Sequence, residues 1–315
     1  MSPPPPALGA LDPDAPLPFG RNSLVRAAVA EPVTALLVQR ALVMDVAHPQ
    51  VAAAVAHHSR FQRRPLSRTW VTVDAALRLV FGDEGVARGA ARQIYGVHDH
   101  INGQVVGSDD RDRDRDGDRD RDGDRDRDGE HSGYSAHDAS LLAWVWATLV
   151  DTTETAFTRW VRPFDAVEAR AFYAEMRSFA QFLGIPDDLL PVDRAAFSGY
   201  LEDMLVADEI GTSDESRAVA RDVLWFEHRV VPSPIVRVER VLALATLDPR
   251  LVDRLEIHPG PADLELGRKL DAWLRAYYRR FPRPPRLLPP LYVLMRRPSI
   301  GLGGRARAVM GMASR

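Results

Sequence analysis

Apolar side chains recur along most of this chain at the three- and four-residue spacing that places them on one face of a helix. The strongest pattern runs from Leu141 to Val161, and Pro163 is expected to stop it. The alternation of apolar and polar residues that is typical of strands is essentially missing. The pattern therefore predicts an all-α fold with a single core. Further helices are expected over residues 23–44 (broken at Pro32), 49–61, 69–81, 83–102, 166–183, 194–207, 213–225, 235–246 and 264–281.

Some of the expected helices begin at residues that favour helix starts. Asp83 is the expected N-cap of the helix over residues 83–102. Ser135 and Asp138 have the S-x-x-D spacing of a capping box. This spacing predicts that the longest helix begins near Tyr134.

Three segments lack the helical pattern and divide the chain. Residues 1–22 are rich in proline, and residues 282–315 form an arm rich in proline and arginine. Residues 108–131 are a low-complexity Arg/Asp repeat that has no apolar residue from Ser108 to Glu130 to offset the entropy of ordering. We expect residues 1–22 and the repeat to be disordered. The repeat is expected to be a loop inserted in one helical domain over residues 23–281, because long surface insertions cost little in closure entropy.

Composition and charge narrow the chemistry. The 315-residue chain has no cysteine, which excludes disulfides, thiolate-bound zinc and a cysteine nucleophile. Residues 109–130 carry twelve acids and seven arginines, so the rest of the chain is nearly neutral and gives no reason to expect a nucleic-acid partner. No stretch reaches the roughly 18 apolar residues of a membrane span, and no leader peptide is recognisable. A soluble, cytoplasmic protein is expected.

Among the nine histidines, His98 has the most distinctive surroundings. On a helix it shares a face with Ala91, Ile94 and Ile101, which are all apolar, so its imidazole is expected to point into the protein. A buried imidazole needs a hydrogen-bond partner, a metal ion or a haem iron. On the residues alone, both a hydrogen-bonded core histidine and an iron ligand remain open.

Arg68 and Thr72 are four residues apart and share one helix face. An arginine that faces a pocket can hold a propionate or another carboxylate with two hydrogen bonds, whereas an arginine on the surface pairs with an acid. The signatures of other enzyme classes, such as HExxH, GxSxG and the repeated Glu-x-x-His pairs of di-iron bundles, do not occur. Both interpretations of Arg68 stay open.

A series of motifs follows in order along the chain: His48-Pro49-Gln50-Val51, His58-Ser59-Arg60-Phe61, Val80-Phe81-Gly82-Asp83, His98 followed by Gly103, Tyr134-Ser135-Ala136, Trp144-Val145 and Ala147-Thr148-Leu149-Val150-Asp151. Over roughly Pro32 to Gly211, this series resembles the MpaB-type oxygenase family, which includes the rubber oxygenases called latex-clearing proteins. The resemblance implies an all-α, globin-like helical bundle that holds a b-type haem and uses dioxygen as co-substrate. The family's axial histidine falls on His98, and its arginine and threonine on an earlier helix fall on Arg68 and Thr72.

What the resemblance implies is a haem b-dependent oxygenase that acts on an apolar small molecule, with His98 as the proximal iron ligand. Tyr134 and Trp146 are expected to line the cavity, although relatives carry a histidine where Trp146 stands. The sequence identifies no redox partner. The alternative is a non-catalytic helical protein that keeps the fold and binds haem or a lipid. Non-haem iron is a further alternative, with ligands drawn from His57, His58, His98 and His100.

Overall fold

The computed structural model describes residues 8–9, 11–12, 15–20, 22–58, 74–104, 133–226 and 233–281. The Arg/Asp repeat, the C-terminal arm, Arg68 and Thr72 lie outside these residues. The all-α prediction is confirmed, because the described residues are mostly helical and their strands form one two-stranded sheet. Residues 74–81 are helical, and the other elements are α1 (Leu24–Val29), α2 (Pro32–Ala35), α3 (Val38–Asp45), α4 (Pro49–His58), α6 (Glu84–His98), β1 (Asn102–Gln104), β2 (Gly133–Ser135), α7 (Ala139–Ala156), the π-helical turn η3 (Phe157–Val161), α8 (Ala166–Phe182), the short turn η4 (Asp187–Leu189), α9 (Arg194–Val206), α10 (Asp214–Leu224), α11 (Ser233–Leu244), α12 (Pro249–Arg254) and α13 (Pro261–Arg280).

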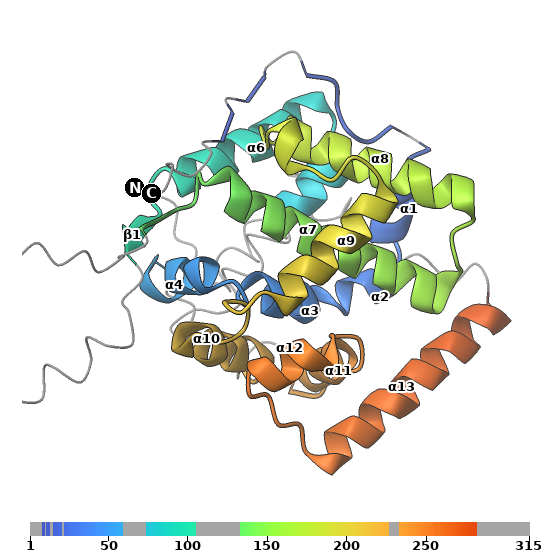
Figure 1. Cartoon of the computed structure of the whole chain (residues 1–315). Helices are drawn as coiled ribbons and strands as arrows, with labels where there is room; N and C mark the ends of the chain where they lie inside the picture. Colours follow the sequence, from blue (N-terminus) through green and yellow to red (C-terminus); the bar gives the residue numbers. More distant parts are fainter. Residues whose placement is uncertain are drawn as a thin grey trace, which may run out of the picture.

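Helix α7 occupies the middle of the fold because it is apolar on almost every side. Its buried residues include Leu141, Trp144, Trp146 and Val150, whose spacing places them around the helix. Helices α1, α2, α3 and α8 all pack against α7. Figure 1 shows α6 and α8 on one side of α7 and α3 and α4 on the other. Side chains on these neighbouring helices are therefore positioned relative to α7.

Three large apolar clusters hold the helices together. The largest lies between α1, α6, α7 and α8 and contains Phe172 and Met176. A second cluster joins α3, α4, α10 and α12, and Leu224 and Leu251 are almost completely buried in it. The third packs α13 on η3 and α11 through Leu274. Each such side chain stabilises the fold by roughly 1.5–3 kcal/mol when it is buried.

The start of α7 differs from the prediction. Tyr134 and Ser135 lie in strand β2, and α7 begins after Asp138, whose side chain accepts a hydrogen bond from the amide of Ser140 at 2.8 Å. Ser135 is not the N-cap, so the predicted capping box is wrong. The reason is tertiary: β2 pairs with β1, with Tyr134 opposite Gly103, and this pairing takes the backbone groups that an earlier helical turn would have used.

The same strand pairing ends α6 earlier than expected. The helix begins after its predicted cap, Asp83, which accepts a hydrogen bond from the amide of Val86 at 3.0 Å. It stops at His98 because Asn102 already belongs to β1. His98 is therefore the last residue of a helix and lies four residues before β1.

Other helix ends agree closely with the sequence pattern. The helical run of α7 and η3 stops before Pro163, and α8 is closed by Gly184, whose φ of +79° favours glycine. Helix α12 was not predicted, because its six residues are too few to show a helical period. Its start after Asp248, with Pro249 in the first turn, is nevertheless a recognisable signal.

Candidate functional site

His98 lies at the margin of the core. The buried Ala91 and the half-buried Ile94 precede it on the same face of α6, and His98 itself is half-buried. Its Nδ1 atom is shielded from solvent. Its ring meets the ring of His137 edge-on, with 6.1 Å between the centroids and 79° between the planes. His98 thus lies where the apolar face of α6 meets a group of rings.

His137 is held in place by two contacts from α6 and the residue that follows it. Its Nε2 atom lies 2.7 Å from Oδ1 of Asp99. The centroid of its ring lies 5.6 Å from the centroid of the Tyr95 ring. The hydroxyl of Tyr95 donates to the carbonyl oxygens of Leu183 and Gly9 at 2.8 and 2.7 Å. Burial raises the pKa of Tyr95 to about 12, so this hydroxyl keeps its proton at neutral pH. The end of α6 is therefore a fixed group of hydrogen-bonded rings.

Tyr134 belongs to the same end of the molecule. It is buried in a small cluster with Ala53 of α4, and its hydroxyl lies 3.0 Å from Nδ1 of His57. Burial raises the pKa of Tyr134, so the hydroxyl stays protonated at neutral pH. Gly103 leaves room for the Tyr134 ring, because a Cβ atom at Gly103 would lie 2.5 Å from the Tyr134 hydroxyl. We name His57, His98, His137, Tyr95 and Tyr134 the ring cluster.

Trp146 lies elsewhere. It is 2 % exposed, and its Nε1 atom donates to the carbonyl oxygen of Met176 on α8 at 2.7 Å. Its ring packs edge-on against Tyr173 and Phe197, on α8 and α9. These contacts place Trp146 in the largest apolar cluster of the core, on a side of α7 that the ring cluster does not use.

The other predicted site residues separate into two groups. Arg68 and Thr72 lie outside the described residues, so their place relative to His98 stays a prediction. His100 is exposed, and its Nδ1 atom lies 3.0 Å from the carbonyl oxygen of Gly96. Within the described part of the chain, no three His, Asp or Glu side chains lie together as a metal site would require.

A polar seam runs along the interface of α3 and α7. The guanidinium of Arg40 donates to Asp151 at 2.5 Å and to the hydroxyl of Thr152 at 2.7 Å. Further along, the hydroxyl of Thr148 donates to the carboxylate of Asp45. Burial raises the pKa of Asp45 to about 7, and the Thr148 hydrogen bond opposes this shift. The seam therefore combines a buried ion pair with a carboxyl group that titrates near neutral pH.

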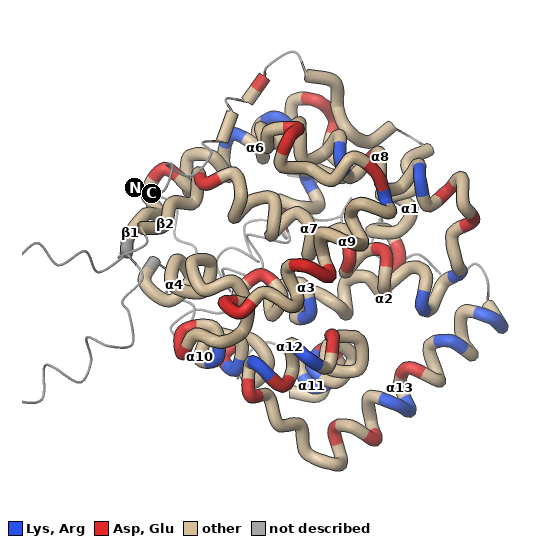
Figure 2. Tube along the Cα trace, viewed as in Figure 1, with Lys and Arg blue, Asp and Glu red and all other residues tan. Residues whose placement is uncertain are grey.

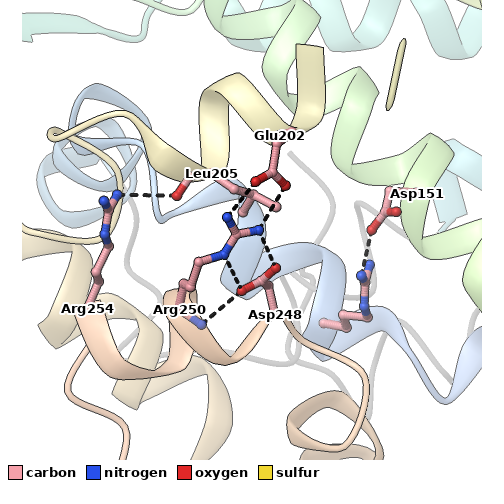
Figure 3. Close-up of polar contacts among 7 residues, drawn as sticks. Asp151, Glu202, Leu205, Asp248, Arg250 and Arg254 are labelled. Carbon is pink, nitrogen blue, oxygen red and sulfur yellow. Dashed lines mark hydrogen bonds and ion pairs between the residues drawn. The ribbon is translucent and has the colours of Figure 1, made fainter. Parts of the chain in front are cut away.

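A cavity of about 350 Å³ opens beside this seam, and sequence reasoning missed it. Its rim is charged: Figure 3 shows Arg250 between the carboxylates of Glu202 and Asp248, with distances of 2.6 and 2.8 Å. Its lining comes from α3, α7, α9, α12 and the residues before α12, so no single sequence motif could have indicated it. None of the predicted site residues that the structure describes lines this cavity. The lining residues are Arg40, Met44, Asp151, Arg194, Phe197, Ser198, Leu201, Glu202, Leu205, Thr246, Leu247, Asp248 and Leu251.

Comparison with protein families gives a match over most of the chain. A family model described as the catalytic domain of ER-bound oxygenase mpaB/B′ and rubber oxygenase matches residues 26–280. The matched range contains the ring cluster, the α3–α7 seam and the cavity. No curated protein and no solved structure gives a match. None of the described helices has the length and apolar character that crossing a bilayer requires.

Proposed function

The chain belongs to the family of ER-bound oxygenases mpaB/B′ and rubber oxygenases, and from this premise we propose that it is a haem b-dependent oxygenase for an apolar small molecule. Dioxygen is the co-substrate in this proposal. The family is an oxygenase family, which supports the reaction class. The observation that carries the cofactor assignment is the half-buried imidazole of His98 among the rings at the end of α6.

The residues at this end of the molecule fit a haem group in their chemistry. A histidine imidazole is the usual proximal ligand of haem proteins that bind dioxygen. His98 offers such an imidazole, with Nδ1 shielded from solvent and an apolar helix face before it. Haem bound there would supply an iron atom that binds and activates dioxygen.

Each of the chain's own residues has a separate task in this proposal. His98 holds the iron, and the Asp99–His137 pair limits the movement of the His98 ring from one side. The hydroxyl of Tyr134 lies 3.0 Å from Nδ1 of His57, and this hydrogen bond fixes the Tyr134 ring. Arg68 is proposed to bind a haem propionate and Thr72 to donate a hydrogen bond nearby.

A visible spectrum of the purified protein tests the proposal. We expect a Soret band in the wild-type protein and its loss in His98→Ala, because the imidazole is the proposed iron ligand. His100→Ala is the matched control: His100 lies two residues away and is exposed, so this variant should keep the band. Circular dichroism should show the same helix content in all three proteins.

Two outcomes would contradict the assignment. Full haem content in His98→Ala would remove His98 as the ligand, and a protein that contains iron without porphyrin would favour non-haem iron. Parallel measurement of iron and of the pyridine haemochrome separates these outcomes.

The second candidate is a helical protein that binds haem or a lipid without catalysis. The position of Trp146 favours it, because the residue that stands where relatives have a histidine is packed in the core and hydrogen-bonded to Met176. Oxygen consumption by the haem-loaded protein in the presence of apolar alkenes separates the two functions. Uptake above the rate without alkene supports the oxygenase, and its absence with intact haem supports the binding protein.

A further inference from the structure

Helix α13 lies at the edge of the molecule (Figure 1). It presents aromatic rings to solvent. Trp273 and Phe281 are 57 % and 50 % exposed, whereas Leu274 and Tyr278 face the protein. Trp273 stacks on Tyr277 with 5.2 Å between the ring centroids, and Tyr277 contacts Phe281 at 5.3 Å. The three rings are four residues apart and form one row along the helix.

Basic residues accompany this row. Lys269 and Arg280 are four and seven residues from Trp273, so they lie on the same side of α13. The guanidinium carbon of Arg280 lies 5.3 Å from the centroid of the Phe281 ring. We name Lys269, Trp273, Tyr277, Arg280 and Phe281 the α13 face.

The charge of the chain is strongly polarised towards its C-terminus. From Ala272 to Arg315 there are ten arginines and no acidic residue, although the whole chain has a net charge of −3. Figure 2 shows only basic charged residues on the last turns of α13. The near-neutral average of the chain conceals this positive region, which begins on the α13 face.

We propose that the α13 face docks on the surface of a membrane rich in anionic lipids. Aromatic side chains favour the boundary between head groups and acyl chains, and arginine pairs well with lipid phosphate. A helix lying in the plane of the interface satisfies both groups of side chains without crossing the bilayer.

Other binding partners would interact favourably with only some of the side chains on the α13 face. Duplex nucleic acid would attract the arginines but has no apolar layer in which Trp273 and Phe281 lose water. A second copy of the chain packed through the same face would bring the basic side chains of the two copies together, which is unfavourable. The proposal is independent of haem binding, because α13 packs on α11 and η3 and not on the elements that carry the ring cluster.

Sedimentation of the full-length protein with lipid vesicles tests the charge component. We expect binding to vesicles of phosphatidylcholine and phosphatidylglycerol, little binding to phosphatidylcholine alone, and release at high salt. The double variant Lys269→Gln/Arg280→Gln should bind about thirtyfold more weakly, since two basic contacts are removed. The control Arg92→Gln/Arg170→Gln removes the same charge from exposed positions on α6 and α8 and should bind like the wild type.

The aromatic component has its own matched pair. Trp273→Ala/Phe281→Ala should bind at least tenfold more weakly, an estimate of about 1.4 kcal/mol or more for two rings that lose contact with lipid. Leu264→Ala is the control, because Leu264 is 51 % exposed on the same helix but nine residues from Trp273 and so on its opposite side. Brominated lipids should quench tryptophan fluorescence in the wild type and quench it much less in Trp273→Phe.

The proposal is overturned by any of three results in variants that keep wild-type circular dichroism. The first is vesicle binding that is equally strong with and without anionic lipid, or that is unchanged in both α13 double variants. The second is tighter binding to duplex DNA than to the anionic vesicles, weakened by the same variants. The third is a dimer in solution that the Trp273→Ala/Phe281→Ala variant dissociates.

Discussion

Around the start of α7 the protein gathers aromatic and imidazole rings, whereas beside the second half of α7 it gathers charges. In the ring cluster, His137 contacts the carboxylate of Asp99. The charged region holds the Arg40–Asp151 pair and, across the cavity, the contacts of Arg250 with Glu202 and Asp248. The same helix therefore supports two regions with different electrostatics.

The difference indicates which region can bind a cofactor and which region mainly stabilises the fold. In the charged region, guanidinium and carboxylate groups neutralise each other, so little of their binding capacity remains for a ligand. In the ring cluster, imidazole and hydroxyl groups lie in partly apolar surroundings, where an imidazole can serve as a metal ligand. This contrast favours the end of α6 as the cofactor site over the cavity beside the α3–α7 seam.

The largest effect expected at a fixed pH comes from breaking the buried ion pair of the charged region. Arg40→Ala should lower the free energy of unfolding by about 3 kcal/mol, because it leaves the Asp151 carboxylate without its partner in a largely buried place. Arg250→Ala is the control from the exposed rim, where solvent screens both partners, and should leave the stability unchanged within error. Urea unfolding followed by circular dichroism measures both. An equal loss of unfolding free energy in the two variants would show that the buried pair stabilises the protein no more than the exposed pair does.

A smaller effect is expected from crowding the ring cluster. Gly103→Ala should destabilise the protein by about 2 kcal/mol, because the new Cβ atom would lie 2.5 Å from the hydroxyl of the buried Tyr134. Gly96→Ala, in the exposed part of α6, has no atom within 4 Å of its new Cβ and should stabilise the helix by roughly 0.5–1 kcal/mol. Thermal unfolding measures both changes. A neutral Gly103→Ala would mean that the packing around Tyr134 is loose.

The last effect is a dependence of stability on pH in the α3–α7 seam, and it accumulates over several pH units. Burial raises the pKa of Asp45 to about 7, so the folded protein keeps a proton that the unfolded chain loses near pH 4. The stability from this group is fully present below about pH 4 and is lost as the pH rises to about 7, by about 1.4 kcal/mol per pH unit. Asp45→Asn should remove this slope.

Glu239 provides the control for that measurement. Its pKa is also raised to about 7 by burial, so it contributes a similar slope. Glu239→Gln should therefore leave the Asp45 contribution intact, and the difference between wild type and Asp45→Asn isolates it. Unfolding curves at several pH values between 4 and 8 supply the data. Parallel curves for wild type and Asp45→Asn would contradict the assigned pKa.

Much of the fold could be predicted from local signals. Asp83 as an N-cap, Pro163 as a stop and Gly184 at a helix end each act through their own backbone or side chain, so their effect does not need a partner far along the chain. Ser135 failed as a cap because a strand 31 residues earlier in the chain pairs with its neighbour Tyr134 at Gly103. A pattern read along one segment contains no information about such a partner.

The candidate site divides in the same way. His98 could be selected from the sequence because the apolar residues of its own helix face single it out. Its neighbour His137 could not, because the contact joins the end of α6 to the residues just before α7. Trp146 was expected from a resemblance to line the haem cavity, which stays a prediction. Its ring packs against α8 and α9, and this contact depends on the rotation of α7 in the core.

By itself, the sequence determined that this chain is helical, where most helices begin and end, and to which oxygenase family it is similar, since these properties follow from local preferences and ordered motifs. Only the tertiary structure decided which rings meet at His98, that Arg40 and Asp151 form a buried pair, and that α13 leaves an aromatic and basic face uncovered. These results depend on contacts between residues that are distant in the chain. Burial and the loss of solvent screening, which set the energies of such contacts, exist only once the helices are packed.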